Sequence, residues 1–233
     1  MDHADLLQPN QRGPESNCAK MKSKHNKGAQ ADSAVAASLS SALAFPRKYI
    51  MADYKTLPER TQIRLEKIKS DVVSVVPEEV RSWKFDTREL VVGEALPSII
   101  DEVKNWYKRG CLYLYILQIA DDFHDPSKFL DMYCQAKNDA IGGRAYARPN
   151  KKSSPYLYVG SSEKPYQRLK EHLGFGAKGT YAIQLAYWAN STECSILFEC
   201  ARYPIGISQE ALQALEDTLW SDLMPMLGRQ RAR

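Results

Sequence analysis

The segment from Tyr156 to Gly174 combines residue types that could bind a phosphate group and act on it. Its pattern predicts a strand that ends near Gly160, then a turn and a helix in which Arg168 and His172 share one face. Arginine binds phosphate oxygens in pairs through its planar guanidinium, and histidine exchanges protons near neutral pH. Tyr158 could direct a phenol to the same place. The alternative is an ordinary strand-turn-helix unit with a solvated basic face.

A carboxylate on the last predicted helix could add a metal ligand. Residues 209–223 carry an apolar stripe that includes Leu215 and Leu219, and Glu216 lies on or beside it. A carboxylate there is costly to bury without a partner. Mg²⁺ binds carboxylate oxygen while it keeps several of its waters, so it is one suitable partner. A half-exposed glutamate paired with a lysine or arginine is the alternative.

Together these residues resemble the motifs of the GIY-YIG nuclease superfamily. The second strand signature of the family stands here as Tyr158-Val159-Gly160, and Arg168 and His172 follow at the family spacing. Glu216 matches the metal-binding glutamate, and Pro225 follows it at the family distance. The resemblance covers residues 110–229, about half of the chain.

The first signature of the family departs from its usual form. It corresponds to Cys111-Leu112-Tyr113, with Gly110 directly before it. The link from Tyr113 to Tyr158 is much longer than in most members and is similar to the enlarged insertion of some restriction-type members. Gly228 stands where the family often has an asparagine that hydrogen-bonds to the site.

The resemblance implies hydrolysis of DNA phosphodiester bonds with the help of one Mg²⁺ or Mn²⁺ ion. In this interpretation Glu216 holds the metal ion, which polarises the phosphate and stabilises the leaving oxyanion. Arg168 clamps the scissile phosphate and its developing charge. Tyr113 activates water, aided by the metal or by His172, and Tyr158 positions the water or the phosphate.

Binding to DNA would need further basic residues, because so small a core contacts few phosphates. The loop 142–152 reads GGRAYARPNKK and sets Tyr146 among its basic residues, a composition that suits phosphate tracking. A solvated loop is the alternative, and it is the preferred interpretation of the acidic run 121–125. The candidate DNA-binding residues are Arg144, Arg148, Lys151, Lys152, Lys164 and Lys170.

These side chains require a small layered framework. Apolar and β-branched runs predict strands, and amphipathic periodicity predicts helices. We expect an α/β (α+β) fold with a small three-stranded mixed sheet flanked by helices, GIY-YIG-like, and an N-terminal helical extension. Residues 182–189 form a helix or a strand. The predicted strands are 111–120, 156–160 and 195–201, and the predicted helices are 57–70, 94–108, 127–140, 166–173 and 209–223.

Composition divides the chain into three parts. Residues 1–50 are rich in Ala, Ser, Gln, Asn and Lys and predict a disordered extension. Met51 opens a different kind of sequence, so translation could also begin there and make the extension spurious. We expect a helical N-terminal region at 51–109 and a nuclease domain at 110–233 with an insertion at 121–155.

The overall composition limits the class of protein but does not identify a binding partner. The chain has 233 residues, 44% of them hydrophobic, and a net charge of +4. No apolar run approaches the ~18 residues of a membrane span. The five cysteines form no C-x-x-C pair, which favours a reducing compartment and a cytoplasmic protein.

Two functions follow from the residues and the resemblance. The first is a metal-dependent DNA endonuclease in restriction, host defence or repair, which would dimerise in order to cut both strands. The second is a DNA-binding module that kept the fold and weakened its catalysis, as Gly228 and Cys111 suggest. A small globular scaffold without a nucleic-acid role is a third hypothesis.

Overall fold

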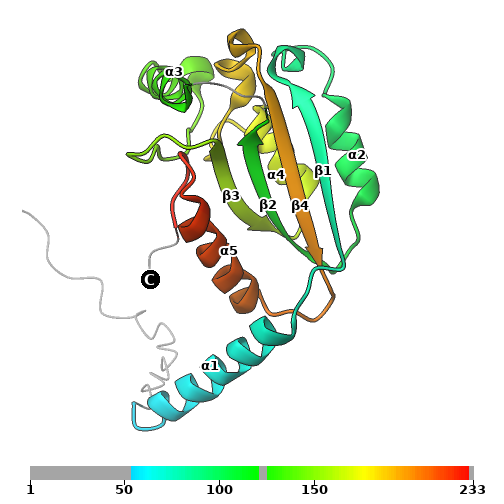
Figure 1. Ribbon diagram of the computed structural model, residues 1–233, viewed down its shortest axis with the longest axis vertical. Helices are drawn as coiled ribbons and strands as arrows, with labels where there is room; N and C mark the ends of the chain where they lie inside the picture. Colours follow the sequence, from blue (N-terminus) through cyan, green and yellow to red (C-terminus); the bar gives the residue numbers. More distant parts are fainter. Residues whose placement is uncertain (1–53, 121–124, 231–233) are drawn as a thin grey trace, which may run out of the picture. The chain divides into compact units, whose positions relative to one another are not determined.

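A computed structural model describes residues 54–120 and 125–230 (Figure 1). The described residues belong to one compact unit built on a four-stranded sheet with the order β1-β4-β2-β3. Its strands are β1 (Glu79–Asp86), β2 (Leu112–Ile119), β3 (Tyr156–Ser162) and β4 (Ser195–Tyr203). The α-helices are α1 (Leu57–Ser74), α2 (Ser98–Trp106), α3 (Pro126–Asn138), α4 (Pro165–Leu173) and α5 (Gln209–Leu223).

The predicted α/β class is confirmed, but the prediction of a three-stranded mixed sheet is wrong. All three strand pairs are antiparallel, and β1 is a fourth strand. Of the residues in β1, Phe85 is buried, Trp83 is partly buried against the same core, and most of the others are exposed. Two apolar residues in alternation are too short a pattern to indicate a strand from the sequence. The strand forms through backbone pairing with β4, from Glu79 opposite Arg202 to Asp86 opposite Ser195.

The sheet has a different cover on each face, because side chains alternate along a strand. Tyr115 and Leu117 of β2 belong to the main core, which also contains residues of α2 and α4. Leu114 points to the other face and packs in a smaller cluster with Leu212 of α5. Figure 1 shows α2 and α4 on one side of the sheet and α5 on the other.

The closing helix α5 has the bounds that the sequence predicts. Ser208 caps its N-terminus, and the Ser208 hydroxyl accepts a hydrogen bond from the Ala211 N–H. The helix ends at Leu223, and Met224 follows in a left-handed conformation with φ 45°. This turn directs the chain back along β3, where the Met226 and Leu227 N–H groups donate to the Tyr156 and Leu157 carbonyls.

The segment between β2 and β3 is part of the core. Phe129 and Tyr133 of α3 each make an edge-to-face contact with Trp188, with ring centroids 4.7 and 5.3 Å apart. Within the segment 182–189, residues Leu185–Tyr187 form only a short 3₁₀ helix. Ala182 forms a parallel bridge with Tyr146. The insertion is therefore held against the rest of the domain.

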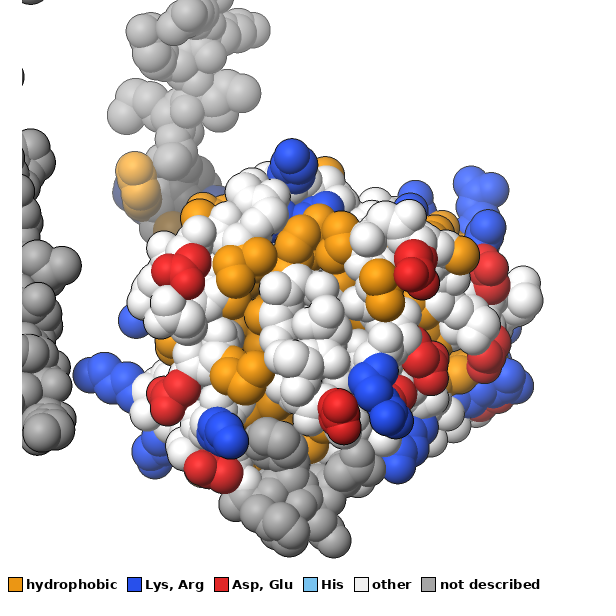
Figure 2. Space-filling model, turned by 90° about the horizontal axis from the view of Figure 1, so that it is seen from above, with side chains coloured by type: hydrophobic (Ala, Val, Ile, Leu, Met, Phe, Trp, Pro, Cys, Tyr) orange, Lys and Arg blue, Asp and Glu red, His pale blue; other side chains and the backbone are white. Residues whose placement is uncertain are grey.

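Several sequence predictions fall on residues that the structure does not describe. They concern the extension at 1–50 and most of the acidic run at 121–125. Within the described part of the chain, no helix has the length and hydropathy to cross a membrane. On the face seen in Figure 2, lysine and arginine side chains are interspersed with aspartate and glutamate rather than gathered in one patch.

Candidate active site

The site is centred on a pair of residues that face each other across β2 and β3. Tyr115 lies opposite Gly160, and the neighbouring Tyr158 ring stacks on Tyr115 with centroids 6.3 Å apart and an interplanar angle of 11°. A Cβ on Gly160 would lie 2.7 Å from the Tyr115 hydroxyl and 2.9 Å from the Tyr158 ring. Glycine therefore leaves the space that the two phenol rings need.

His172 lies behind Tyr115 as a buried hydrogen-bond partner. Its Nε2 is 3.1 Å from the Tyr115 hydroxyl, and its Nδ1 accepts from the Ile183 N–H at 3.4 Å. Since Nδ1 is an acceptor, the neutral ring carries its proton on Nε2 and donates it to Tyr115. Burial, together with the Arg168 charge, holds the pKa of His172 well below its usual value. The ring is thus neutral at physiological pH.

Arg168 brings a permanent positive charge to the same place. It lies one helical turn before His172 on α4 and pairs with Glu171 three residues later. Burial alone would lower its pKa, but Tyr115, Tyr158 and Glu171 raise the pKa overall, so the guanidinium stays charged. The Tyr115 phenol responds in the opposite sense: burial raises its pKa, and the Arg168 charge offsets part of that rise.

Glu216 approaches the site from the other face of the sheet. It lies on α5 with a partly buried side chain, and its Oε2 accepts a hydrogen bond from the Ser161 hydroxyl at 2.5 Å. Ser161 follows Gly160 on β3, which is an edge strand. Residues from both faces of the sheet can therefore meet at this edge.

A single open cavity of about 770 Å³ brings these groups together. Tyr115, Tyr158, Arg168 and Glu216 all line it, while His172 lies behind it against Tyr115. Glu216 is the one acidic residue among the lining residues that the structure describes. The remaining charged lining residues are all basic: Lys137, Arg148 and Arg229. This arrangement suits an anionic ligand with a hydrated metal cation bound to it.

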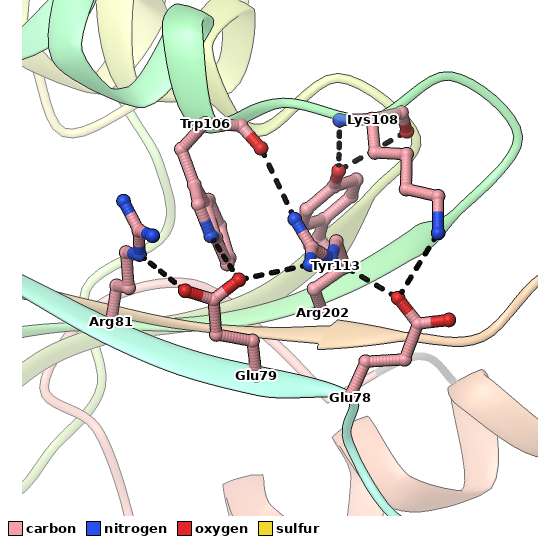
Figure 3. Close-up of polar contacts among 7 residues, drawn as sticks. All are labelled: Glu78, Glu79, Arg81, Trp106, Lys108, Tyr113 and Arg202. Carbon is pink, nitrogen blue, oxygen red and sulfur yellow. Dashed lines mark hydrogen bonds and ion pairs between the residues drawn. The ribbon is translucent and has the colours of Figure 1, made fainter.

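Tyr113, the predicted water-activating tyrosine, does not line this cavity. Its hydroxyl donates to the Lys108 carbonyl at 3.1 Å and accepts from the Lys108 N–H at 2.7 Å. Figure 3 shows it beside the ion pairs that join Arg202 to Glu78 and Glu79. Tyr115 shares its face of the sheet two residues further along, about 7 Å away. Tyr113 therefore lies outside the cavity, and Tyr115 lines it instead.

The predicted DNA-binding residues separate into two groups. Arg144 makes internal contacts: its guanidinium donates to the Gly176 carbonyl at 2.8 Å and lies over the Tyr187 ring. Tyr146, the aromatic residue of that loop, is buried and donates to the Ile141 carbonyl. Arg148 lines the cavity and is exposed. Four further predicted residues lie on the surface and do not line the cavity: Lys151, Lys152, Lys164 and Lys170. Of these, Lys170 is only partly exposed.

Gly228 fits closely against the site. A Cβ on this residue would lie 2.8 Å from the Tyr158 ring, and the backbone has φ +93°. An asparagine at this position would displace Tyr158, so glycine is required by the packing of this chain.

Comparison with known proteins agrees with this geometry. Residues 146–214 match the family model of the GIY-YIG catalytic domain. No curated protein and no solved structure gave a significant match to the chain. The matched segment contains Tyr158, Arg168 and His172 and ends just before Glu216. Over this segment the chain is similar to the GIY-YIG catalytic domain, a domain found in nucleases.

Proposed function

We propose that this protein is a DNA endonuclease that hydrolyses phosphodiester bonds with the help of a divalent metal ion. One observation carries the proposal: Tyr115, Tyr158, Arg168 and Glu216 line a single cavity whose other charged residues are basic. A phosphodiester is an anion, and its cleavage places further negative charge on oxygen. Fixed positive charge in a partly desolvated site stabilises that charge.

Arg168 is the residue that would bind the scissile phosphate. Its guanidinium can donate two parallel hydrogen bonds to phosphate oxygens. Its pairing with Glu171 limits the positions that the guanidinium can take. Binding energy is then available for the developing charge without reorganisation of the side chain.

Once its own phenol proton has passed to solvent through the open cavity, Tyr115 would hold the attacking water and accept its proton. The Nε2–H of His172 donates to the phenol oxygen, and the Arg168 charge lies beside it. Both interactions stabilise negative charge on that oxygen. Since burial raises the pKa of Tyr115, the phenol is protonated in the resting site, and its deprotonation depends on added positive charge. Tyr158, stacked on Tyr115, would position the phosphate or the water.

Glu216 fits a magnesium or manganese ion that keeps most of its waters. Mg²⁺ is usually held by one or two carboxylates together with substrate phosphate. The described residues contain no group of three or more His, Cys, Asp or Glu side chains that could form a complete protein cage. Bound at Glu216, the metal would supply Lewis-acid polarisation of the phosphate. The Ser161 hydroxyl keeps the carboxylate oriented.

Cleavage of plasmid DNA tests the proposal. We expect purified protein to nick or linearise the plasmid with Mg²⁺ or Mn²⁺ and to be inactive with EDTA. Glu216→Gln should lower the rate at least a hundred-fold, because the metal ligand loses its charge. Asp222→Asn, at an exposed carboxylate on the same helix outside the cavity, is the matched control and should keep full activity. Cleavage that survives Glu216→Gln would contradict the proposal.

The second candidate is a DNA-binding module with weakened catalysis. The observation that favours this candidate is Gly228, which stands in the place of the asparagine found in many family members. DNA binding without cleavage in any divalent metal would favour this candidate. For an active enzyme we propose a cytoplasmic role in restriction, host defence or repair. Cutting of both strands by a homodimer is part of that proposal, as is a nuclease unit at residues 110–233, to whose sheet β1 adds an edge strand.

A further inference from the structure

Tyr181 is an exposed aromatic residue on a rigid segment of the backbone. Its side chain is 73% exposed, although the next residue, Ala182, is completely buried. The Ala182 carbonyl accepts from the Ala147 N–H at 2.9 Å, and the Thr180 carbonyl accepts from the buried Gln184 side chain at 3.0 Å. Both neighbours of Tyr181 are therefore fixed, and the ring projects into solvent from an ordered support.

This ring lies at the cavity that holds the proposed catalytic residues. Tyr181 lines the cavity together with Tyr115 and Arg168. The backbone two residues further on is tied to the site itself, because the Ile183 N–H donates to His172. An exposed phenol ring so close to a phosphate site is well placed to contact the nucleotide that carries the phosphate.

Two arginines on adjacent backbone segments line the same cavity. The Gly228 N–H donates to the Arg148 carbonyl at 2.8 Å, and Pro149 forms an antiparallel bridge with Leu227. Arg148 and Arg229 are thus carried by two paired backbone segments. Both side chains are exposed and both line the cavity. Guanidinium groups bind phosphate oxygens through parallel hydrogen bonds.

We propose that Tyr181, Arg148 and Arg229 form a subsite for one unpaired nucleotide that flanks the scissile phosphate. Arg148 and Arg229 bind its phosphate, and Tyr181 stacks on its base. A base within a regular duplex is stacked on both sides and presents no free face to the ring. The preferred substrate class is therefore DNA with a single-stranded or unstacked nucleotide beside the cut. The inference rests on the proposed function in that the cavity is taken to hold the cleaved phosphate.

Binding of short labelled oligonucleotides in EDTA tests the subsite without a cleavage step. Tyr181→Ala should weaken binding of a short oligothymidine about 5- to 100-fold, in line with the usual contribution of base stacking. Tyr181→Phe should bind as the wild type does, because it keeps the aromatic face. Binding of a blunt duplex should be unchanged in both variants. Tyr54→Ala is the matched control, since Tyr54 is 75% exposed and outside the cavity.

The arginines have a separate readout in the salt dependence of binding. Arg148→Ala and Arg229→Ala should each reduce the slope of log affinity against log salt by about 0.7 on oligothymidine, while Tyr181→Ala should leave that slope unchanged. Equal losses on single strands and duplex, full affinity in Tyr181→Ala, or a loss in Tyr181→Phe would each overturn the stacking inference. Unchanged slopes in both arginine variants would overturn the phosphate inference.

These outcomes can be distinguished from failure of the proposed function. If the protein binds oligothymidine through Tyr181 but cleaves no DNA, the subsite inference stands and the nuclease proposal is wrong. If the protein cleaves plasmid DNA but Tyr181→Ala equals the wild type in binding and in cleavage of nicked, frayed and single-stranded DNA, the subsite inference alone is wrong.

Discussion

At the scale of single residues, the site depends on a few charges held at fixed places. Arg168 and Glu171 form an ion pair in which the side chains are only 26% and 14% exposed. A single added carbon on Gly176 would lie 2.7 Å from the Glu171 Cγ, so the carboxylate has little space to move. We therefore predict that Glu171 positions Arg168 without contacting the substrate itself.

Substitution of Glu171 should lower the rate more than the affinity. Glu171→Gln keeps the shape of the side chain and removes its charge, so the Arg168 guanidinium samples more positions. We expect kcat for DNA cleavage to fall about ten- to a hundred-fold, as small misplacements of a binding group commonly do, with a smaller change in KM. Steady-state kinetics measure both. Gly176→Ala should reproduce the direction of the effect, and unchanged kinetics in both variants would contradict the positioning role.

The choice between Tyr113 and Tyr115 shows what the sequence could not supply. The stretch CLYLYIL contains two tyrosines on the same face of a strand, and both belong to the core. The register against β3 distinguishes them, because it places Gly160 opposite Tyr115 and Ser162 opposite Tyr113. Register across more than forty intervening residues is a tertiary property. By contrast, Arg168 and His172 are four residues apart in one helix, so local spacing alone predicts that they share a face, while their roles were assigned through the family resemblance.

At the scale of elements, the site is assembled where β3 forms the edge of the sheet. Helix α4 supplies Arg168 from one face, and α5 supplies Glu216 from the other. The bounds of α5 were predictable from its cap at Ser208 and its apolar stripe. Strand β1 was not, because it directs only Trp83 and Phe85 to the core and most of its other residues are charged or polar.

Close packing at the centre of the β2–β3 pair gives a prediction for Gly160. In Gly160→Ala the new Cβ would meet the Tyr115 hydroxyl at 2.7 Å, so the hydroxyl must leave His172. We expect a loss of about 1–3 kcal/mol in stability, a decrease of several degrees in Tm by thermal melting, and nearly complete loss of cleavage.

Gly179→Ala is the matched control for this substitution. No atom lies within 4 Å of a Cβ added at Gly179, and the residue lies outside the cavity lining. It should leave both Tm and activity close to those of the wild type. A Gly160→Ala protein that melts and cleaves as the wild type does would show that Tyr115 does not need its present position.

At the scale of the whole molecule, positive charge is not gathered into one large patch, so its effects depend on where individual cations lie. Residues 151–233 hold ten basic and eight acidic side chains, so long-range attraction to DNA is weak. Figure 2 shows the two signs interspersed on one face. If the protein acts on DNA as proposed, its affinity for DNA should depend on the few cations at the cavity, and a rise in salt should reduce that affinity only as far as those contacts are lost.

The buried His172 couples global stability to pH. Its folded pKa is depressed, so below the ordinary histidine pKa of about 6.5 the unfolded chain binds one more proton than the native protein. The free energy of unfolding should therefore decrease as pH falls below that value, by about 1.4 kcal/mol one pH unit below it. Urea unfolding at neutral and mildly acidic pH measures this.

The variant His172→Gln isolates the contribution of this one ring. Glutamine can still donate to Tyr115 but does not titrate, so the variant should be less stable at neutral pH and lose the histidine part of the pH dependence. The same decrease with falling pH in His172→Gln and in the wild type would assign the effect to other groups.

The pairing of the last described residues with β3 has a consequence during synthesis of the chain. Met226 and Leu227 bond to Tyr156 and Leu157, and Gly228 bonds to Arg148, about eighty residues earlier in the sequence. Residues 226–229 thus form a wall of the cavity. A nascent polypeptide that has been synthesised only as far as the matched 146–214 segment contains most of the candidate site but has an incomplete cavity. The cavity can close only after residue 229 has also left the ribosome.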